Sequence, residues 1–196
     1  MKQIKNIILA SSSPRRLELL NLIGIIPKRV LPPKIDESNK IPSIKKKVSE
    51  IALQKALYIK KKFNISDEFI IAADTTVYRA GTIFNKPKNT FDVTSHLQCL
   101  SGKKHFVYGG ICVVAPNGKI SNRVIITEVY FKKISKCDYD NLFLINDGIG
   151  KAGGYSIQSS GALLVKKIKG SFSNVVGLSL YDVNNMLIGL GWKKSK

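Results

Sequence analysis

The sequence predicts an α/β domain built on a mixed, twisted sheet with helices packed against it. Three observations support this class. Short apolar strands alternate with helical patterns, the first strand leads through a tight loop into a helix, and two β-branched runs flank a turn in mid-chain. The chain has 196 residues, of which 44% are hydrophobic, so we expect a single domain over residues 1–196.

The first half of the chain is predicted to alternate strands and helices. The first helix has well-marked ends, because Ser13 suits the N-cap, Pro14 is favoured at the first helical position and Gly24 lies just beyond the last turn. Ser43 can cap a second helix in the same way. The predicted ranges are a buried strand over 6–10, helices over 14–23 and 44–62, and an apolar strand over 69–73 with a hairpin partner over 81–84.

The second half is predicted to place a long antiparallel hairpin between helices. Its turn is Pro116-Asn117-Gly118, and the residues on both sides are apolar and β-branched. Ser135 and Asp138 resemble the start of another helix. The remaining ranges are a helix over 90–100, hairpin strands over 106–114 and 123–131, a glycine-rich stretch over 148–154, a strand over 162–168 and a closing helix over 178–190.

The chain is strongly basic, with a net charge of +19. Only five of its 32 cations are arginines, and the lysines are scattered in pairs and triplets, which is typical of a solvated surface. The competing interpretation is a nucleic-acid-binding or division-regulating protein without turnover, whose cations neutralise phosphates. No aromatic-rich strand set or helix-turn-helix spacing supports it in the sequence, so we expect no specific nucleic-acid partner.

The sequence contains no apolar run near the ~18 residues that span a bilayer, and the apolar run within residues 1–10 is too brief for a signal peptide. Three cysteines without CxxC spacing argue against a disulfide framework and a zinc cluster. We therefore expect a soluble protein of the reducing cytoplasm with no membrane partner.

Two adjacent arginines occupy an unusual position. Arg15 and Arg16 fall in the first turn of the predicted helix, where the helix dipole favours acidic residues. The position becomes favourable if an anion binds there, because backbone N–H groups, the hydroxyls of residues 11–13 and two guanidinium groups can all contact phosphate oxygens. The alternative is an ordinary capped helix with solvent-exposed arginines.

Lys55 differs from the other lysines by its helical phase. It lies four residues after Ile51 and seven after Val48, at the centre of an apolar stripe. It either extends to the rim of the core or reaches an anion in a cleft. Asp74 ends the predicted strand, where ligands of α/β sheets gather. The pair Asp36-Glu37 is either a surface loop or joins Asp74 around a divalent cation.

Several other chemistries lack their motifs. A haloacid-dehalogenase type of phosphatase needs a second aspartate two residues after Asp74, where this chain has Thr76, and neither GxSxG nor HExxH occurs. His96 and His105 have no ligand partner at metal spacing, so we interpret both as structural. The run GKAGGYSIQ (150–158) is a weak phosphate-loop signal, and a tight turn is the alternative.

Taken together, the motifs identify a family. The sequence resembles the Maf family of nucleotide pyrophosphatases, once described as septum-formation inhibitors. Nine motifs occur in order over nearly the whole chain. They are LASSSPRRLELL (9–20), IDES (35–38), a helical lysine (Lys55), AADTTV (72–77), NKP (85–87), LSGKKH (100–105), TEVYF (127–131), GKAGGYSIQ (150–158) and GSFSNVVGLSL (170–180).

The resemblance implies an elongated fold with a deep cleft between two lobes, similar to the inosine-triphosphate pyrophosphatases, and usually a homodimer. It implies hydrolysis of nucleoside triphosphates to monophosphate and pyrophosphate with a divalent cation, Mg²⁺ or Mn²⁺. The implied roles are triphosphate binding by Ser11, Arg15 and Arg16, further positive charge from Lys55 and Lys86, metal binding or water activation by Glu37 and Asp74, and substrate binding by Gln158.

The stretch GYSIQ, together with NVVGL, resembles the branch that accepts dTTP and UTP. Two departures from the family pattern lie near the implied base pocket. Asp147-Gly148-Ile149 stands where GEP is frequent, and Gly109 replaces a usual threonine. The expected mechanism is attack of water, oriented or deprotonated by Asp74 or Glu37, on the α-phosphorus. A regulatory nucleotide-binding protein that has lost turnover is a third possibility.

Overall fold

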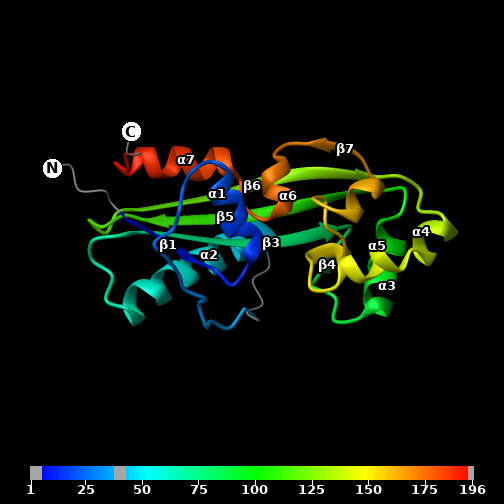
Figure 1. Cartoon of the computed structure of the whole chain (residues 1–196), viewed down its shortest axis with the longest axis horizontal. Helices are drawn as coiled ribbons and strands as arrows, with labels where there is room; N and C mark the ends of the chain where they lie inside the picture. The colour runs from blue at the N-terminus through cyan, green and yellow to red at the C-terminus, as the bar shows by residue number, and fades with distance from the viewer. Residues whose placement is uncertain (1–5, 38–42, 194–196) are drawn as a thin grey trace. The chain divides into compact units, whose positions relative to one another are not determined.

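The computed structural model describes residues 6–37 and 43–193. Strands and helices alternate along this part of the chain, as the sequence predicts (Figure 1). The strands are β1 (Ile7–Ala10), β2 (Arg29–Val30), β3 (Phe69–Arg79), β4 (Thr82–Phe84), β5 (Lys104–Val114), β6 (Ile120–Phe131) and β7 (Val165–Lys169). The α-helices are α1 (Pro14–Leu22), α2 (Ile44–Lys62), α3 (Thr90–Leu100), α4 (Lys136–Asp140), α5 (Leu142–Gly148), α6 (Phe172–Val176) and α7 (Leu180–Gly189), and the 3₁₀ turns are η1 (Ala152–Gly154) and η2 (Ser160–Leu164).

The chain forms two compact units, each assembled from separate stretches of sequence. Unit 1 comprises the chain up to Asp74, Gly109–Ile125 and the part from Gly177 onward. Unit 2 comprises Thr75–Tyr108 and Ile126–Val176. None of the helices in the described residues has both the length and the hydropathy of a membrane span.

The strands join in a sheet of mixed direction. Their order is β2-β1-β3-β5-β6-β7, with β4 paired to β3 outside this path. β1 is parallel to β2 and β3, with Ala10 opposite Ala72, while β3–β4 and β6–β7 are antiparallel. Neighbouring β5 and β6 are connected by a turn in which the Gly118 N–H donates to the Ala115 carbonyl (2.9 Å). The mixed sheet confirms the predicted α/β class.

In unit 1, α2 packs on the sheet through the apolar stripe that its sequence predicts. Ala52, Ala56 and Ile59 are fully buried against strand residues that include Ile8 and Ile70. The contact is close, because a Cβ at Gly110 would lie 2.0 Å from the Val48 carbonyl oxygen. Burial of these side chains is the main force that fixes α2 on the sheet, at roughly 25 cal/mol per Å² of apolar surface.

In unit 2, residues 104–108 of β5 alternate between exposed or partly exposed and buried, so one face of this part of the strand faces a core. His105 lies on this buried face, and its Nε2 is 2.9 Å from the hydroxyl of Tyr155. The ring of Phe131 packs edge-on against both residues. His105 is therefore a core residue, as the sequence predicts.

Several predicted boundaries are wrong, and the hairpin strand predicted over 123–131 begins at Ile120. The strand predicted over 69–73 continues to Arg79, because the β-branched residues Thr75 to Val77 extend it and its last residues pair with β4. Asp74 thus lies within a strand rather than at its carboxyl end. The strand predicted over 162–168 begins only at Val165, since Ser160–Leu164 forms a 3₁₀ turn.

Candidate active site

The loop between β1 and α1 organises the predicted anion site. The Ser11 hydroxyl oxygen accepts hydrogen bonds from the Ser13 backbone N–H and from Arg16 Nη1, both at 3.1 Å. Arg16 Nε donates to the Gly177 carbonyl oxygen at 2.9 Å. Pro14 occupies the first helical position and Ser13 the N-cap, as predicted. The Arg16 side chain is therefore anchored beside Ser11 at the start of α1.

The charges around Arg16 distinguish it from a surface arginine. The first turn of α1 contains no acidic residue. Burial lowers the pKa of Arg16 from its ordinary value, the nearby carboxylates of Asp74 and Glu37 oppose this shift, and Arg15 adds to it. Arg16 thus lies within electrostatic reach of both acids, although they are distant in sequence.

Lys55 joins the same two acids directly. Its Nζ is 2.9 Å from Asp74 Oδ1 and 2.9 Å from Glu37 Oε1. Because α2 buries its apolar stripe, Lys55 is carried inward with it and is only 7% exposed. Of the two predicted positions for Lys55, the structure supports the one that meets an anion, and the anions are carboxylates of this chain.

The two acids differ in their surroundings. The Asp74 side chain is 10% exposed, whereas that of Glu37 is 55% exposed. Asp74 is held on a central strand directly after the buried residues 69–73, while Glu37 belongs to an irregular segment after β2. The Asp74–Lys55 pair is therefore the buried part of the site, and Glu37 is its exposed part.

The donor set suits a hard divalent cation that keeps part of its shell for other ligands. In the described residues, no group of three or more His, Cys, Asp or Glu side chains is arranged to hold a metal ion. Glu37 and Asp74 meet at one ammonium group, so two carboxylates are available at a common point. Mg²⁺ is usually held by one or two carboxylates together with water and substrate phosphates. The residues therefore fit such an ion.

Two other predicted site residues, Lys86 and Gln158, belong to unit 2. Lys86 follows β4 and is exposed. Gln158 is also exposed, although the three residues before it are buried. The structure thus places Ser11, Arg15, Arg16, Glu37, Lys55 and Asp74 in unit 1, and Lys86 and Gln158 in unit 2.

One member of the site is absent from the sequence prediction. The Gly177 carbonyl oxygen binds Arg16, and Gly177 has a φ of 144°, a conformation that favours glycine. Gly177 lies in the motif GSFSNVVGLSL, so the signal was present as a glycine within a polar turn. Its role could not be predicted from the sequence, because the acceptor is a backbone carbonyl oxygen, which every residue carries.

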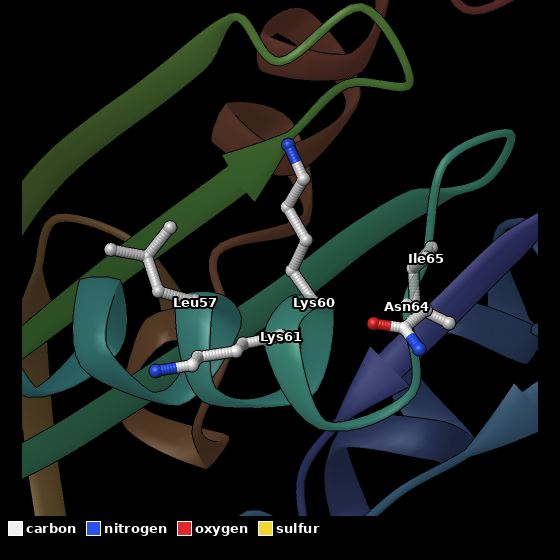
Figure 2. Close-up of a pocket in the computed structure, with 5 residues that line it drawn as sticks. All are labelled: Leu57, Lys60, Lys61, Asn64 and Ile65. Carbon is white, nitrogen blue, oxygen red and sulfur yellow. The ribbon is translucent and has the colours of Figure 1, made fainter.

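A surface pocket lies apart from these residues. It is lined by Leu57, Lys60, Lys61, Asn64 and Ile65 at the C-terminal end of α2 (Figure 2). The ammonium groups of Lys60 and Lys61 point in different directions. No predicted site residue lines it, so we do not assign the candidate active site to this pocket.

The chain belongs to the Maf-like protein family, whose model matches residues 6–190. It is 37% identical over 198 residues to a protein of Mesorhizobium japonicum named dTTP/UTP pyrophosphatase, covering 98% of this chain and 95% of that protein. It is 40% identical over 188 residues to a protein of the same name from Sphingopyxis alaskensis, covering 94% and 96%. The family prediction is confirmed.

A solved structure shares the fold. A HAM1 protein from Coxiella burnetii covers 94% of this chain, and 99% of that protein is covered in return, with a TM-score of 0.55 and 15% sequence identity. At this identity the likeness concerns the fold alone. It confirms the predicted mixed α/β fold.

Proposed function

We propose that this protein is a nucleoside triphosphate pyrophosphatase that hydrolyses dTTP and UTP to the monophosphate and pyrophosphate. The observation that carries the proposal is the meeting of Lys55 with Asp74 and Glu37, beside the anchored Arg16. The site combines cations that can bind a triphosphate with carboxylates that can activate water. The names of the relatives support the reaction and the two nucleotides.

The triphosphate is proposed to bind at the start of α1. Ser11, Arg15 and Arg16 offer a hydroxyl and two guanidinium groups next to the helix N-terminus, whose N–H groups favour anions. Because Arg16 is anchored by Ser11 and Gly177, its charge is already oriented before substrate arrives. Such preorganised charge is usually the largest contribution to stabilising a phosphoryl-type transition state.

Asp74 is proposed to orient and deprotonate the attacking water. The water oxygen bonds to the α-phosphorus, the bond from that phosphorus to the bridging oxygen breaks, and pyrophosphate leaves while the carboxylate takes the water proton. Glu37 is the alternative base. We favour Asp74 because its side chain is buried and fixed by Lys55, and a general base must keep its distance to the water.

Glu37 and Asp74 are also the residues proposed to hold a divalent cation, Mg²⁺ or Mn²⁺. Such an ion supplies positive charge that neutralises phosphate oxygens. Lys55 holds the two carboxylates together, which reduces the rearrangement that ion binding requires.

In unit 2, Lys86 is proposed to add a positive charge for the substrate phosphates and Gln158 to contact the nucleotide. Both side chains are exposed and both lie in family motifs. The stretch GYSIQ resembles the branch for dTTP and UTP, which supports these nucleotides over methylated guanine nucleotides. We further propose that the protein works as a homodimer in the cytoplasm, where its three thiols remain reduced.

A product assay with labelled water tests the proposal. The protein is incubated with each common nucleoside triphosphate and Mg²⁺ or Mn²⁺ in H₂¹⁸O, and both products are measured by mass spectrometry. We expect pyrophosphate release, fastest from dTTP and UTP, with ¹⁸O only in the monophosphate. Label in the pyrophosphate would contradict attack at the α-phosphorus. Salt-sensitive DNA binding without turnover would favour the nucleic-acid alternative, and nucleotide binding without turnover a regulatory role.

A further inference from the structure

The side-chain carboxylate of Asp147, in unit 2, accepts hydrogen bonds from several side chains. Its Oδ1 accepts a hydrogen bond from Lys151 Nζ at 2.7 Å, and its Oδ2 accepts one from the Ser160 hydroxyl at 2.7 Å. The Ser159 hydroxyl also donates to Oδ2, and Lys151 Nζ donates to the Asp147 carbonyl oxygen. The carboxylate thus gathers three side chains from two places in the sequence.

These partners stand on both sides of the segment that carries Gln158. Lys151 precedes the buried residues 153–157, and Ser159 and Ser160 follow Gln158 directly. The Asp147 carboxylate therefore links the start of this segment to its end through hydrogen bonds. The side chains of Lys151 and Asp147 are 21% and 17% exposed, so the contact is shielded from water more than an ordinary surface pair.

The segment between these anchors is tightly folded. A Cβ at Gly148 would lie 2.3 Å from the Gly154 carbonyl oxygen, and a Cβ at Gly161 would lie 2.6 Å from that of Ser156. Tyr155 is fixed to His105 in the core. Because the interior of the segment is closely packed, the hydrogen bonds to Asp147 at its two ends are the contacts whose loss would let the segment move.

The negative charge of Asp147 is unfavourable at its position in α5 unless a cation or hydrogen-bond donors lie close to it. Asp147 lies in the last turn of α5, where the negative end of the helix dipole disfavours a carboxylate. Burial raises the pKa of Asp147, but the hydrogen bonds from Lys151, Ser159 and Ser160 outweigh this effect, so the net pKa is below the ordinary value. The group therefore stays ionised and keeps its three donors.

We propose that Asp147 is a positioning residue that holds Gln158 in the orientation required for substrate binding. This inference rests on the proposed function, in which Gln158 contacts the nucleotide. Asp147 acts through the two ends of the 151–160 segment and does not itself contact substrate. It gives a role to the position where this chain departs from the family pattern.

The test compares Asp147→Ala with Asp147→Asn and with a matched control, Asp138→Ala. Asp138 also belongs to unit 2 and binds a lysine and a serine, Lys132 and Ser135, but it borders no predicted substrate residue. We expect Asp147→Ala to raise KM for dTTP about tenfold with a smaller change in kcat, as loss of hydrogen bonds to a charged group predicts. Asp147→Asn keeps an acceptor for the serines and should restore part of the affinity.

Two readouts separate positioning from general damage. Hydrogen exchange of the backbone amides of residues 152–161 should accelerate in Asp147→Ala but not in Asp138→Ala. In a double-mutant cycle, adding Asp147→Ala to Gln158→Ala should raise KM little further, because both changes remove the same contact. Unchanged exchange in this segment, or KM effects that multiply, would overturn the inference. A wild-type protein that releases no pyrophosphate would instead refute the proposed function, while the exchange comparison still tests the restraint by Asp147.

Discussion

Lys55 Nζ lies 2.9 Å from Asp74 Oδ1, although the two residues are 19 positions apart and belong to a helix and a strand. Both are buried, and Glu37 binds the same ammonium group. This pair connects the packing of α2 on the sheet with the chemistry of the site, because the apolar stripe that buries the helix also sets the position of Lys55.

Removing Lys55 should therefore destabilise the fold as well as the reaction. In Lys55→Met, Asp74 keeps its buried charge without its partner, and we expect the free energy of unfolding to fall by about 3 to 5 kcal/mol. Urea unfolding measures this. Lys61→Met, an exposed lysine of the same helix, should change stability by no more than about 0.5 kcal/mol. Equal stabilities of the two variants would show that the buried pair is not an important contact.

Replacing the proposed base should separate binding from turnover. Asp74→Asn keeps the shape of the side chain, and Lys55 retains Glu37 as a partner. We expect kcat to fall at least about a hundredfold, the lower range for loss of a general base, with little change in nucleotide affinity. Pyrophosphate release and calorimetric titration with dTTP measure the two effects. Asp67→Asn, an exposed acid before β3, is the control, and normal turnover in Asp74→Asn would exclude Asp74 as the base.

The anion site at α1 predicts a specific role for one arginine. Arg16→Ala removes a guanidinium group that Ser11 and Gly177 hold in place, and we expect KM for dTTP to rise about tenfold or more. Arg123→Ala serves as a matched control, because Arg123 pairs with Asp182 at 3.4 Å and is half exposed. Steady-state kinetics compare the variants, and equal KM values for both would contradict the anion site.

His105 should make the fold sensitive to acid. Burial, with a smaller contribution from the charge of Arg79, lowers the pKa of His105 to about 3, whereas an unfolded chain has a histidine pKa of about 6.5. Between these values only the unfolded chain takes up the proton, so stability falls as pH drops below about 6.5, by up to about 1.4 kcal/mol per pH unit. Above this range the contribution is fully present.

Urea unfolding at pH 7, 6 and 5 measures this dependence. His105→Gln retains a polar partner for Tyr155 but does not titrate, so its stability should vary less over the same range. An equal pH dependence in wild type and variant would show that other groups cause the acid sensitivity.

The accuracy of the sequence predictions varied with the range of the interactions involved. The start of α1 was predicted correctly because the preference of Pro14 for the first helical turn is local, although the Ser13 side chain at the N-cap makes no capping hydrogen bond. The helix α2 was predicted because its apolar residues repeat with the helical period. The strand expected over 162–168 was wrong at its start, since residues 162–164 lie in a 3₁₀ turn whose own residue Gly161 packs closely against Ser156. That contact depends on how the chain folds back on itself.

By itself, the sequence determined the family, the α/β class and the residue types of the site, because motif order and hydrophobic periodicity are properties of the chain. It also identified Lys55 as unusual through its helical phase. Only the tertiary structure decided that Lys55 binds Asp74 and Glu37 together, that Gly177 anchors Arg16, and that Asp147 closes the segment around Gln158. These contacts join residues far apart in sequence, or backbone atoms that carry no side-chain signal, so they exist only once packing has brought the segments together.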